Sequence, residues 1–284
     1  MINKDLHCPY SILSSDIICE HKSARIEQPN TPTLHNHDGY ELLLFLNGNA
    51  NIFVESEEKK LQYGDLIIIP PYLYHGIRVT EIEQYERIVI NIRSGTLRDL
   101  GDEETDLISM FQPEKGNKFI LIPLTEQQVN DMEPILGNLE KSLNKRIYGH
   151  TVLSKAYLTE FLINVANLTM RNSTSDYENI MTPVVKKIFE YIDANIYNEI
   201  SVNSIALNLH HNVDYLGRIF KNATGSNLKY YINGKKIALA QKLLREGNSP
   251  YDVCFILSFN NYSSFSRTFS EHAGMSPKQY VKGL

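Results

Sequence analysis

The sequence predicts an α+β protein of two domains: an N-terminal antiparallel β-barrel with helices attached, and a C-terminal domain built only of helices. Three observations support this prediction. Short apolar runs separated by turn signals fill residues 33–93, helical spacing begins after Pro123, and an internal duplication occupies the last third of the chain. A length of 284 residues also leaves room for more than one core.

The strands of the predicted barrel are marked by turn residues. The stretch ELLLFLNGNANIFVES (41–56) contains an apolar strand, an Asn-Gly turn and a second strand with alternating side chains. Gly64-Asp65 precedes the β-branched run 67–69, which Pro70-Pro71 ends, and YERIVINIR (85–93) is a further strand. Short strands at this spacing are typical of a small antiparallel barrel or sandwich.

Two helices are expected at 125–144 and 150–171. In the second, Leu153, Tyr157, Phe161 and Val165 recur every four residues. This stripe has two interpretations, packing against the barrel or contact with a second copy of the chain. We expect a homodimer that pairs through these helices.

A polar segment without periodicity, RNSTSDYENIM (171–181), separates the helices from the rest. Pro183 then stands at a helix start. We therefore divide the chain into an N-terminal domain (1–171), a linker (172–182) and a C-terminal domain (183–284).

Charge is divided unevenly between these parts. From Pro183 onward, 12 Lys and Arg stand against 7 Asp and Glu, a net charge of +5, whereas the preceding 182 residues hold 16 against 26, a net charge of −10. A basic module on an acidic body indicates a polyanion as one partner.

The cysteines and the apolar runs bear on the compartment. Cys8, Cys19 and Cys254 form no CxxC pair, which disfavours a disulfide framework or a structural zinc site. The stretch MINKDLHCPYS has no apolar signal segment, and no apolar run approaches the ~18 residues of a membrane span. We expect a soluble, cytoplasmic protein that does not enter a membrane.

The duplication relates DYLGRIFKNATG (214–225) to SSFSRTFSEHAG (263–274) at an offset of 49. Upstream, SVNSIALNL (201–209) matches SPYDVCFIL (249–257) at an offset of 48. Each copy has the pattern of helix, turn, helix, with expected N-caps at Ser201, Asn212, Ser249, and Asn260 or Asn261. This is the helix-turn-helix layout that places a second helix in a DNA major groove.

One amphipathic helix is expected between the copies, from Asn227 to Glu246. At 1.5 Å per residue it spans ~27–30 Å, close to the ~34 Å of one DNA turn. A bundle whose duplicated helices only pack is the alternative. Against it, Arg218 and Arg267 face outward at the same place in both copies, where an arginine reads guanine or holds a phosphate.

Residues 183–284 resemble the DNA-binding domain of the AraC/XylS family of bacterial transcription regulators, and FNNYSSFSRTFSEHAGMSPKQYV (259–281) is similar to that family's C-terminal signature throughout. The resemblance implies two helix-turn-helix units in successive major grooves, with promoter DNA and RNA polymerase as partners. It also implies DNA contacts from the outward residues of both second helices, namely Asp214, Gly217, Arg218, Tyr262, Ser263, Ser266 and Arg267.

The chain departs from the family pattern in both turns. His210-His211 stands where a glycine is usual, and Ser258 replaces the glycine before Phe259. Asp214 and Gly217 are also poor readers of bases, so the first unit is expected to contribute less specificity than the second.

The N-terminal domain contains His35-x-His37-x3-Glu41-x6-Gly48 and then Gly64-x5-Pro70-x4-His75, which resemble the two cupin motifs in full. Alternate residues of a strand share a face, so His35 and His37 can point into a barrel together. In metal-dependent cupins these positions bind one divalent ion. The resemblance therefore implies a possible metal at His35, His37, Glu41 and His75, and a metalloenzyme as one hypothesis.

The competing hypothesis is a sensor pocket without catalysis, because AraC-like regulators use a cupin-like barrel to bind a small effector, commonly a sugar. Imidazoles, a carboxylate, tyrosines and an arginine would offer donors and acceptors to a polyhydroxylated ligand. We favour this hypothesis, with no enzymatic activity and no required cofactor. The expected effector residues are His35, His37, Tyr40, Glu41, Tyr74, His75 and Arg87, with Asn91 as an alternative to Arg87.

The sequence thus predicts a homodimeric transcription regulator, expected to be an activator, which binds promoter DNA under the control of a carbohydrate. Effector binding would change the relative disposition of the two domains, which requires a different effector affinity in the two arrangements.

Overall fold

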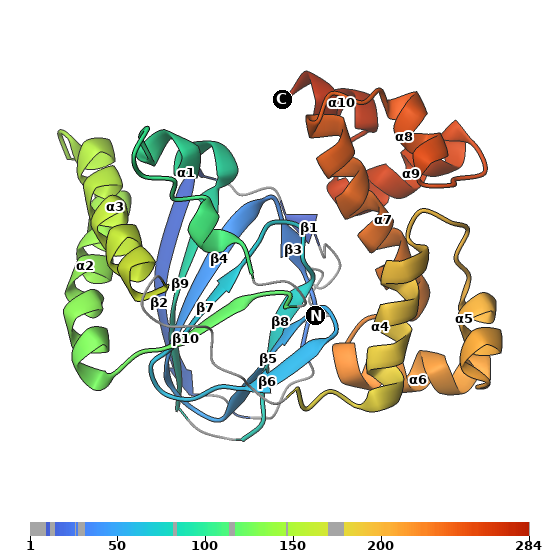
Figure 1. The fold of residues 1–284 in the computed structure, drawn as a ribbon, viewed down its shortest axis with the longest axis horizontal. Helices are drawn as coiled ribbons and strands as arrows, with labels where there is room; N and C mark the ends of the chain where they lie inside the picture. Colours follow the sequence, from blue (N-terminus) through green and yellow to red (C-terminus); the bar gives the residue numbers. More distant parts are fainter. Residues whose placement is uncertain are drawn as a thin grey trace.

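The computed structural model describes residues 10–11, 15–25, 27, 32–81, 84–113, 117–145, 147–169 and 179–283. These residues form a β-sheet domain with helices on one side and a second domain made only of helices (Figure 1). The predicted α+β class is confirmed. No helix in these ranges combines the length and the hydrophobicity that a membrane crossing requires.

The strands of the N-terminal domain form two main antiparallel sheets and one small parallel pair. The strands are β1 (Tyr10–Ser11), β2 (Ile17–Arg25), β3 (Asn36–His37), β4 (Gly39–Asn47), β5 (Ala50–Val54), β6 (Glu57–Lys60), β7 (Asp65–Ile69), β8 (His75–Val79), β9 (Gln84–Arg93) and β10 (Ile120–Pro123). A five-stranded sheet has the order β10-β7-β4-β9-β2, a three-stranded sheet has the order β6-β5-β8, and β1 pairs with β3.

The two faces of the five-stranded sheet are buried against different partners. Along β4, Leu42 and Leu44 belong to the core shared with the helices, whereas Leu43 and Phe45 belong to the core shared with the three-stranded sheet. This follows from the period of two in a strand. Both faces are apolar, which explains the nearly continuous apolar run in the sequence.

The sequence prediction of a barrel needs a correction. In the described part of the chain the two main sheets share no strand pairing, so the sheets face each other as a sandwich and do not close. Antiparallel pairing is confirmed within both main sheets. The strands on either side of the Asn47-Gly48 turn do not pair with each other, however, because β4 belongs to the five-stranded sheet and β5 to the three-stranded sheet; Gly48 in this turn has a φ of 118°.

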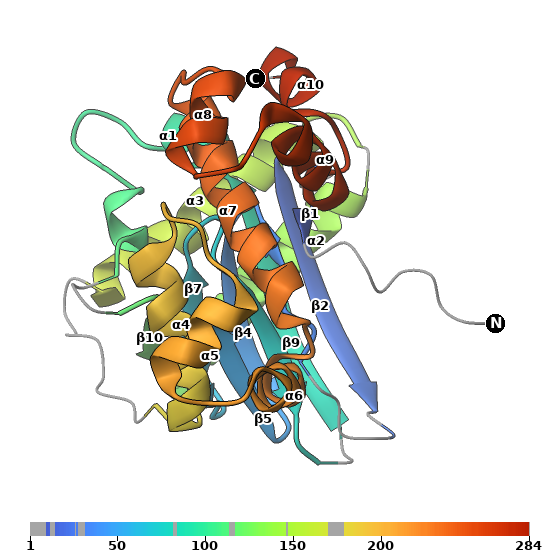
Figure 2. The same cartoon turned by 90° about the vertical axis from the view of Figure 1, so that its right-hand side faces the viewer.

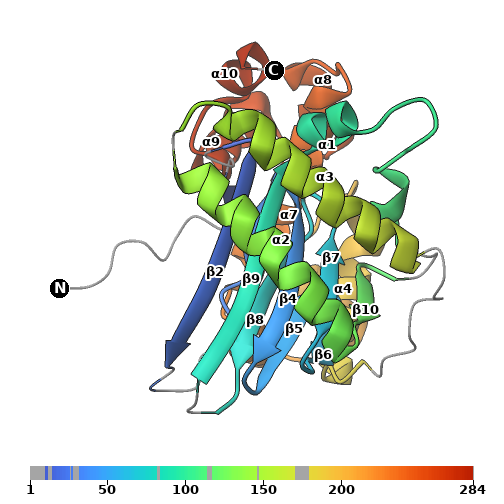
Figure 3. The same cartoon turned by 90° about the vertical axis from the view of Figure 1, so that its left-hand side faces the viewer.

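Helices cover the outer face of the five-stranded sheet (Figure 3). They are α1 (Ser94–Leu100), the 3₁₀ turn Ser109–Phe111, α2 (Glu126–Asn144) and α3 (His150–Thr169). Thr125 begins α2 with a capping box that includes Gln128. Of the predicted stripe on α3, Phe161 and Val165 are buried and Tyr157 is partly buried against the domain core, whereas Leu153 is exposed.

The C-terminal domain contains seven helices among the described residues: α4 (Pro183–Asn195), α5 (Val202–Leu209), α6 (Val213–Thr224), α7 (Leu228–Arg245), α8 (Pro250–Ile256), α9 (Tyr262–Ala273) and α10 (Pro277–Lys282). The predicted N-caps are confirmed, with Asn261 and not Asn260 capping α9. The central helix is α7, bounded by Asn227 and Glu246 as predicted.

Both turns require the conformation that glycine adopts most easily. His210 has a φ of 55° and Ser258 a φ of 52°, so each takes the left-handed conformation at the end of the first helix of its unit. A glycine is usual at these turns because a side chain there raises the energy. Ser258 offsets part of that energy by donating its hydroxyl to the carbonyl of Tyr197, at 2.6 Å.

The two helix-turn-helix units lie at opposite ends of α7, with α6 at one end and α8 and α9 at the other (Figures 1 and 2). Lys236, in the middle of α7, connects them. Its buried ammonium donates to the carbonyl of Asn198 in the first unit and to that of Leu257 in the second, both at 2.7 Å. This contact fixes the relative position of the two units.

The predicted linker lies mostly outside the described residues, which resume at Asn179. The side chain of Asn179 donates to the carbonyl of Ser56 and accepts from the amide of Glu58. Met181 is buried in the core of the first helical unit. The end of the predicted linker is therefore part of the packed interface between the domains.

Candidate effector site and nucleic-acid interface

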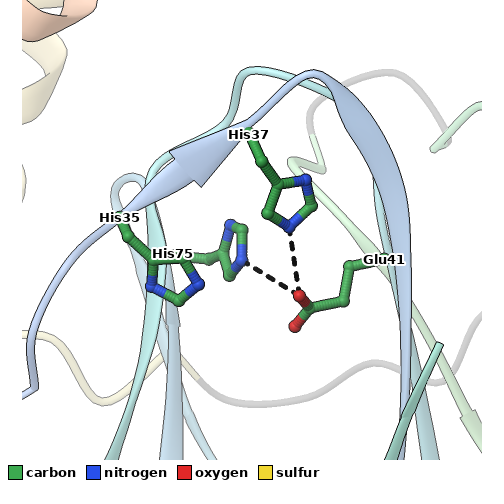
Figure 4. Close-up of side chains that lie close together, drawn as sticks. All are labelled: His35, His37, Glu41 and His75. Atoms are coloured by element: carbon green, nitrogen blue, oxygen red, sulfur yellow. Dashed lines mark hydrogen bonds and ion pairs between the residues drawn. The ribbon is translucent and has the colours of Figure 1, made fainter. Parts of the chain in front are cut away.

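Four polar side chains meet at one end of the space between the two main sheets. His35 and His37 come from the segment around β3, Glu41 from the start of β4 and His75 from the start of β8 (Figure 4). The backbones of His35 and His75 exchange two hydrogen bonds of 2.9 Å, which brings their rings to 4.4 Å between centroids. The motif spacing predicted that these four residues lie close together, and the structure confirms it.

The cluster is almost closed to solvent. His37 is 4%, Glu41 6% and His75 2% exposed. The Nε2 atoms of His37 and His75 lie 3.1 and 3.5 Å from one oxygen of Glu41. A buried carboxylate requires compensation by an opposite charge or by hydrogen-bond donors, and here histidines supply it.

The shared environment moves the pKa values in different directions. Burial alone would raise the pKa of Glu41, but His75 and His37 hold it well below its usual range. Burial opposes the charged form of His75 as well, yet the Glu41 carboxylate raises the pKa of His75. Burial and the charge of His75 lower the pKa of His35 to about 4. At neutral pH these pKa shifts leave the Glu41 carboxylate charged and His35 neutral.

Two of the residues predicted for an effector point elsewhere. Tyr40 precedes Glu41 in the strand, so its side chain lies on the other face of the sheet, against Phe111 at 4.5 Å between ring centroids. Tyr74 packs against Tyr231 of the helical domain at 4.8 Å between ring centroids. Neither side chain joins the cluster.

The inner face of β9 supplies other polar groups. Asn91 lies directly opposite Glu41 in the register, and its Oδ1 is buried without a hydrogen-bond partner in the described part of the chain. Arg87 is opposite Phe45 on the same face and lies over the ring of Tyr85 at 4.9 Å. The cluster thus continues along β9 as a polar strip inside an apolar sandwich.

The second helices of both units present matching surfaces. Arg218 on α6 and Arg267 on α9 each follow the N-cap asparagine by six residues, and both are exposed. Asp214 and Ser263 are exposed, whereas Gly217, Tyr262 and Ser266 are partly buried. The opposite faces of both helices are buried, through Leu216 and Phe220 on α6 and through Phe265 and Phe269 on α9.

Sequence reasoning missed the contacts between the domains. The carboxylate of Glu55, in the turn after β5, is 1% exposed. It accepts hydrogen bonds from the Tyr231 hydroxyl at 2.6 Å and the Lys235 ammonium at 2.8 Å, both on α7. Lys235 also lies 3.3 Å from Asp193. This buried ion pair joins the N-terminal domain to the middle of α7.

Further contacts hold α7 near both of its ends. Arg245, its last residue, donates to Asp38 at 2.8 Å and to the Tyr280 hydroxyl at 2.9 Å. Near the other end, Arg78 of β8 donates to the carbonyl of Ala223 at 2.5 Å; Ala223 lies at the end of α6, just before α7. No local sequence signal marks the contacts of Asp38 and Arg78, because their partners in the helical domain are more than a hundred positions away.

Comparison with known proteins agrees with this two-domain arrangement. Residues 19–162, half of the chain, match the profile of the AraC-like ligand binding domain. Residues 205–283 match the profile of a helix-turn-helix domain.

The HTH-type transcriptional regulator YobQ of Bacillus subtilis is 23% identical over 272 residues, which are 95% of this chain and 95% of YobQ. The melibiose operon regulatory protein of Escherichia coli is 29% identical over 122 residues, which are 43% of this chain and 39% of that protein. Among solved structures, unsaturated fatty acid-bound ToxT from Vibrio cholerae is 15% identical with a TM-score of 0.40, over 94% of this chain and 95% of ToxT.

Proposed function

Since the chain belongs to the AraC family of transcription regulators, we propose that its helical domain reads promoter DNA through both helix-turn-helix units and that a small molecule in the N-terminal domain controls this binding. The observation that supports DNA reading is the pair of exposed arginines, Arg218 and Arg267, at the same position of two recognition helices. Their 18-residue connector α7 is ~27 Å long, close to one turn of DNA.

Arg267→Ala tests the reading of DNA by the second unit. A sequence selected from a random DNA pool serves as the target, and affinity is measured by fluorescence anisotropy at fixed salt. We expect specific binding to weaken by ~1–3 kcal/mol if Arg267 contacts a base. Arg98→Ala, which removes an exposed arginine of α1, is the matched control and should leave the affinity unchanged. Equal affinity of both variants and the wild type would reject this role of Arg267.

For the effector we propose a carbohydrate bound along the inner face of β9. The polar strip of Asn91 and Arg87 beside the histidine cluster supports this choice, because a sugar needs several donors and acceptors inside an apolar wall. Similarity to a regulator of a melibiose operon also supports it. Thermal shifts over a panel of sugars test it, with Asn91→Leu expected to abolish the shift that the best sugar produces.

We further propose that this site senses and does not catalyse. Its groups are nearly closed to solvent and lie below segments that contact the helical domain, so a substrate would have to displace that domain in each turnover. A metalloenzyme would show turnover that is lost in His37→Ala. We also propose that the protein acts in the cytoplasm, because a transcription regulator needs access to promoter DNA.

Pairing and activation complete the proposal. At the start of α3, Ile147, Tyr148 and Val152 are exposed, which supports a homodimer contact there. Val152→Glu is expected to yield monomers in light scattering, whereas Thr151→Glu, at an exposed neighbouring position, is the control. We propose activation through contact with RNA polymerase, which in vitro transcription from a selected promoter tests.

A further inference from the structure

The two helix-turn-helix units have separate apolar cores. The core of the first unit extends along α7 as far as Ile232, and the core of the second unit begins on α7 at Ile237. A hollow of about 390 Å³ opens between the units beside α7, with Arg267 among its lining residues. In the described part of the chain, polar contacts and not a shared core therefore supplement α7 in connecting the two units.

The ammonium of Lys236 lies between the carboxyl ends of two helices, one from each unit. It donates to the carbonyl of Leu257, the C-cap of α8, and to that of Asn198, two residues after the C-cap of α4. The last carbonyls of a helix carry a partial negative charge and favour a cation. Lys236 is 6% exposed, and burial lowers its pKa against the nearby charge of Glu199. A buried ammonium requires such partners, so the contact holds both helix ends to one point.

Ser258 adds a second contact between the same two segments. Its hydroxyl donates at 2.6 Å to the carbonyl of Tyr197, the residue before Asn198. Ser258 has a φ of 52°, a conformation in which a side chain raises the backbone energy and glycine does not. A serine is therefore unfavourable for the turn itself, and its contact with the other unit offers a compensation that glycine could not.

Both segments lead toward the helices that carry the exposed arginines. Residues 257–261 form the turn that enters α9, where Arg267 is exposed. Residues 196–200 lead into α5, whose Ile205 belongs to the same core as Leu216 of α6. A contact between the two segments thus restricts the distance and the angle between α6 and α9.

We propose that Lys236 and Ser258 are positioning residues for DNA reading, which hold α6 and α9 at one separation so that the protein accepts one spacing between its two half-sites. This role rests on the proposed reading of DNA by both units. One added base pair moves the second half-site by ~3.4 Å along the DNA axis and rotates it by ~34°. A rigid pair of units cannot follow this change, whereas a pair without the contact can.

DNA sites of altered spacing test this role. The target is the sequence selected from a random DNA pool, with one base pair inserted or deleted between the two groups of bases whose exchange weakens binding. Dissociation constants are measured by fluorescence anisotropy at fixed salt. For the wild type we expect each change of spacing to weaken binding ~5–150-fold, the equivalent of one good base contact.

Lys236→Met keeps the apolar stem and removes the ammonium. It should lower this spacing penalty at least ~3-fold, because units that are less pre-organised adapt to the shifted half-site. Lys242→Met, at an exposed position of the same helix, is the matched control and should keep the wild-type penalty.

Two variants of Ser258 test the second contact. Ser258→Gly relieves the strain in the turn, so this variant is expected to fold even if Lys236→Met does not. Ser258→Ala removes the hydroxyl without the added freedom of glycine. Both should lower the spacing penalty by ~2-fold, the value of one hydrogen bond at the low end of its range.

A wild-type penalty in both Ser258 variants and in folded Lys236→Met would overturn the proposal. If Lys236→Met does not fold, a wild-type penalty in the two Ser258 variants is sufficient to overturn it. A wild type that loses affinity on Arg218→Ala and on Arg267→Ala but binds all spacings equally would overturn it as well. Unchanged affinity in both arginine variants would instead contradict the proposed function, on which the positioning role depends.

Discussion

The buried contact between Glu55 and Lys235 permits a quantitative test of how the two domains are joined. Glu55→Gln keeps an oxygen that accepts from Tyr231 but removes the charge beside Lys235, whose side chain is 14% exposed. Lys235→Met leaves the Glu55 carboxylate, 1% exposed, with neutral donors only. Removing one partner of a buried ion pair costs ~3–5 kcal/mol. Glu55→Gln should fall at the low end, because Asp193 still lies 3.3 Å from Lys235.

The double variant leaves neither an unpaired carboxylate at 55 nor an unpaired ammonium at 235. Its cost should therefore be smaller than the sum of the single costs, by an interaction energy of ~1–3 kcal/mol. Asp193 is then still neutralised by Lys118, at 2.9 Å.

Urea denaturation of the full-length wild type, both single variants and the double variant gives the four free energies of unfolding. The exposed pair Glu20–Lys22 is the matched control, with Glu20→Gln and Lys22→Met as the same chemical changes. Its single costs and its coupling should each stay below ~1 kcal/mol. Additive costs for Glu55 and Lys235, within ~0.5 kcal/mol, would refute the contact and with it the docked position of α7.

Two further variants probe the same interface and its surroundings. Gly234→Ala would place a methyl group onto the Tyr74 hydroxyl and should destabilise the folded protein by ~1–3 kcal/mol. Gly137→Ala, with open space around it in α2, should stabilise the folded protein by ~0.5–1 kcal/mol. Thermal shifts of the same sign for the two variants would contradict this. His272 is 1% exposed and burial lowers its pKa to about 4, so it is neutral in the folded state and its protonation favours unfolding as pH falls from 6.5 toward 4. Between pH 7.5 and 5.5 this histidine should lower the free energy of unfolding by roughly 1.3 kcal/mol. Urea denaturation of His272→Gln should not show this loss.

Much of the helical domain could be predicted because its signals are local. Ser201, Asn212 and Ser249 cap helices through amides two or three residues away, so a short window of sequence contains the whole interaction. The duplication then supplies the register of the second unit from the first. Only the choice between Asn260 and Asn261 depended on the geometry of the turn.

The effector prediction shows a limit that the strand pattern itself could have revealed. Tyr40 and Glu41 are successive residues of β4, whereas Tyr74 directly precedes β8, which begins at His75. Successive side chains of a strand point to opposite faces, so Tyr40 could not join Glu41 inside the sandwich. The packing of Tyr74 on Tyr231 could not be predicted, because the two residues lie far apart in the sequence.

The contacts between the domains could not be predicted from the sequence. Glu55 and Lys235 are 180 positions apart, and Asp38 and Arg245 are 207 apart. Each is a common charged residue with no special neighbours, and it becomes distinctive only when folding buries it. Such pairs are determined by how two finished surfaces meet, which no local pattern encodes.

These contacts also set the condition under which a ligand can control the protein. A ligand that binds the docked arrangement 100-fold more tightly than the undocked one shifts the equilibrium by ~2.7 kcal/mol. Loss of the Glu55–Lys235 pair alone costs at least as much, and Asp38–Arg245 adds to it. A ligand can therefore control docking only if the docked and undocked arrangements are nearly equal in free energy. This requires that solvation of these charges and the conformational entropy of the undocked domain offset nearly all of the interface energy. It follows that Glu55→Gln, which removes ~3 kcal/mol, should shift the docking equilibrium about as far as loss of the ligand does. DNA affinity in this variant should then no longer respond to the effector.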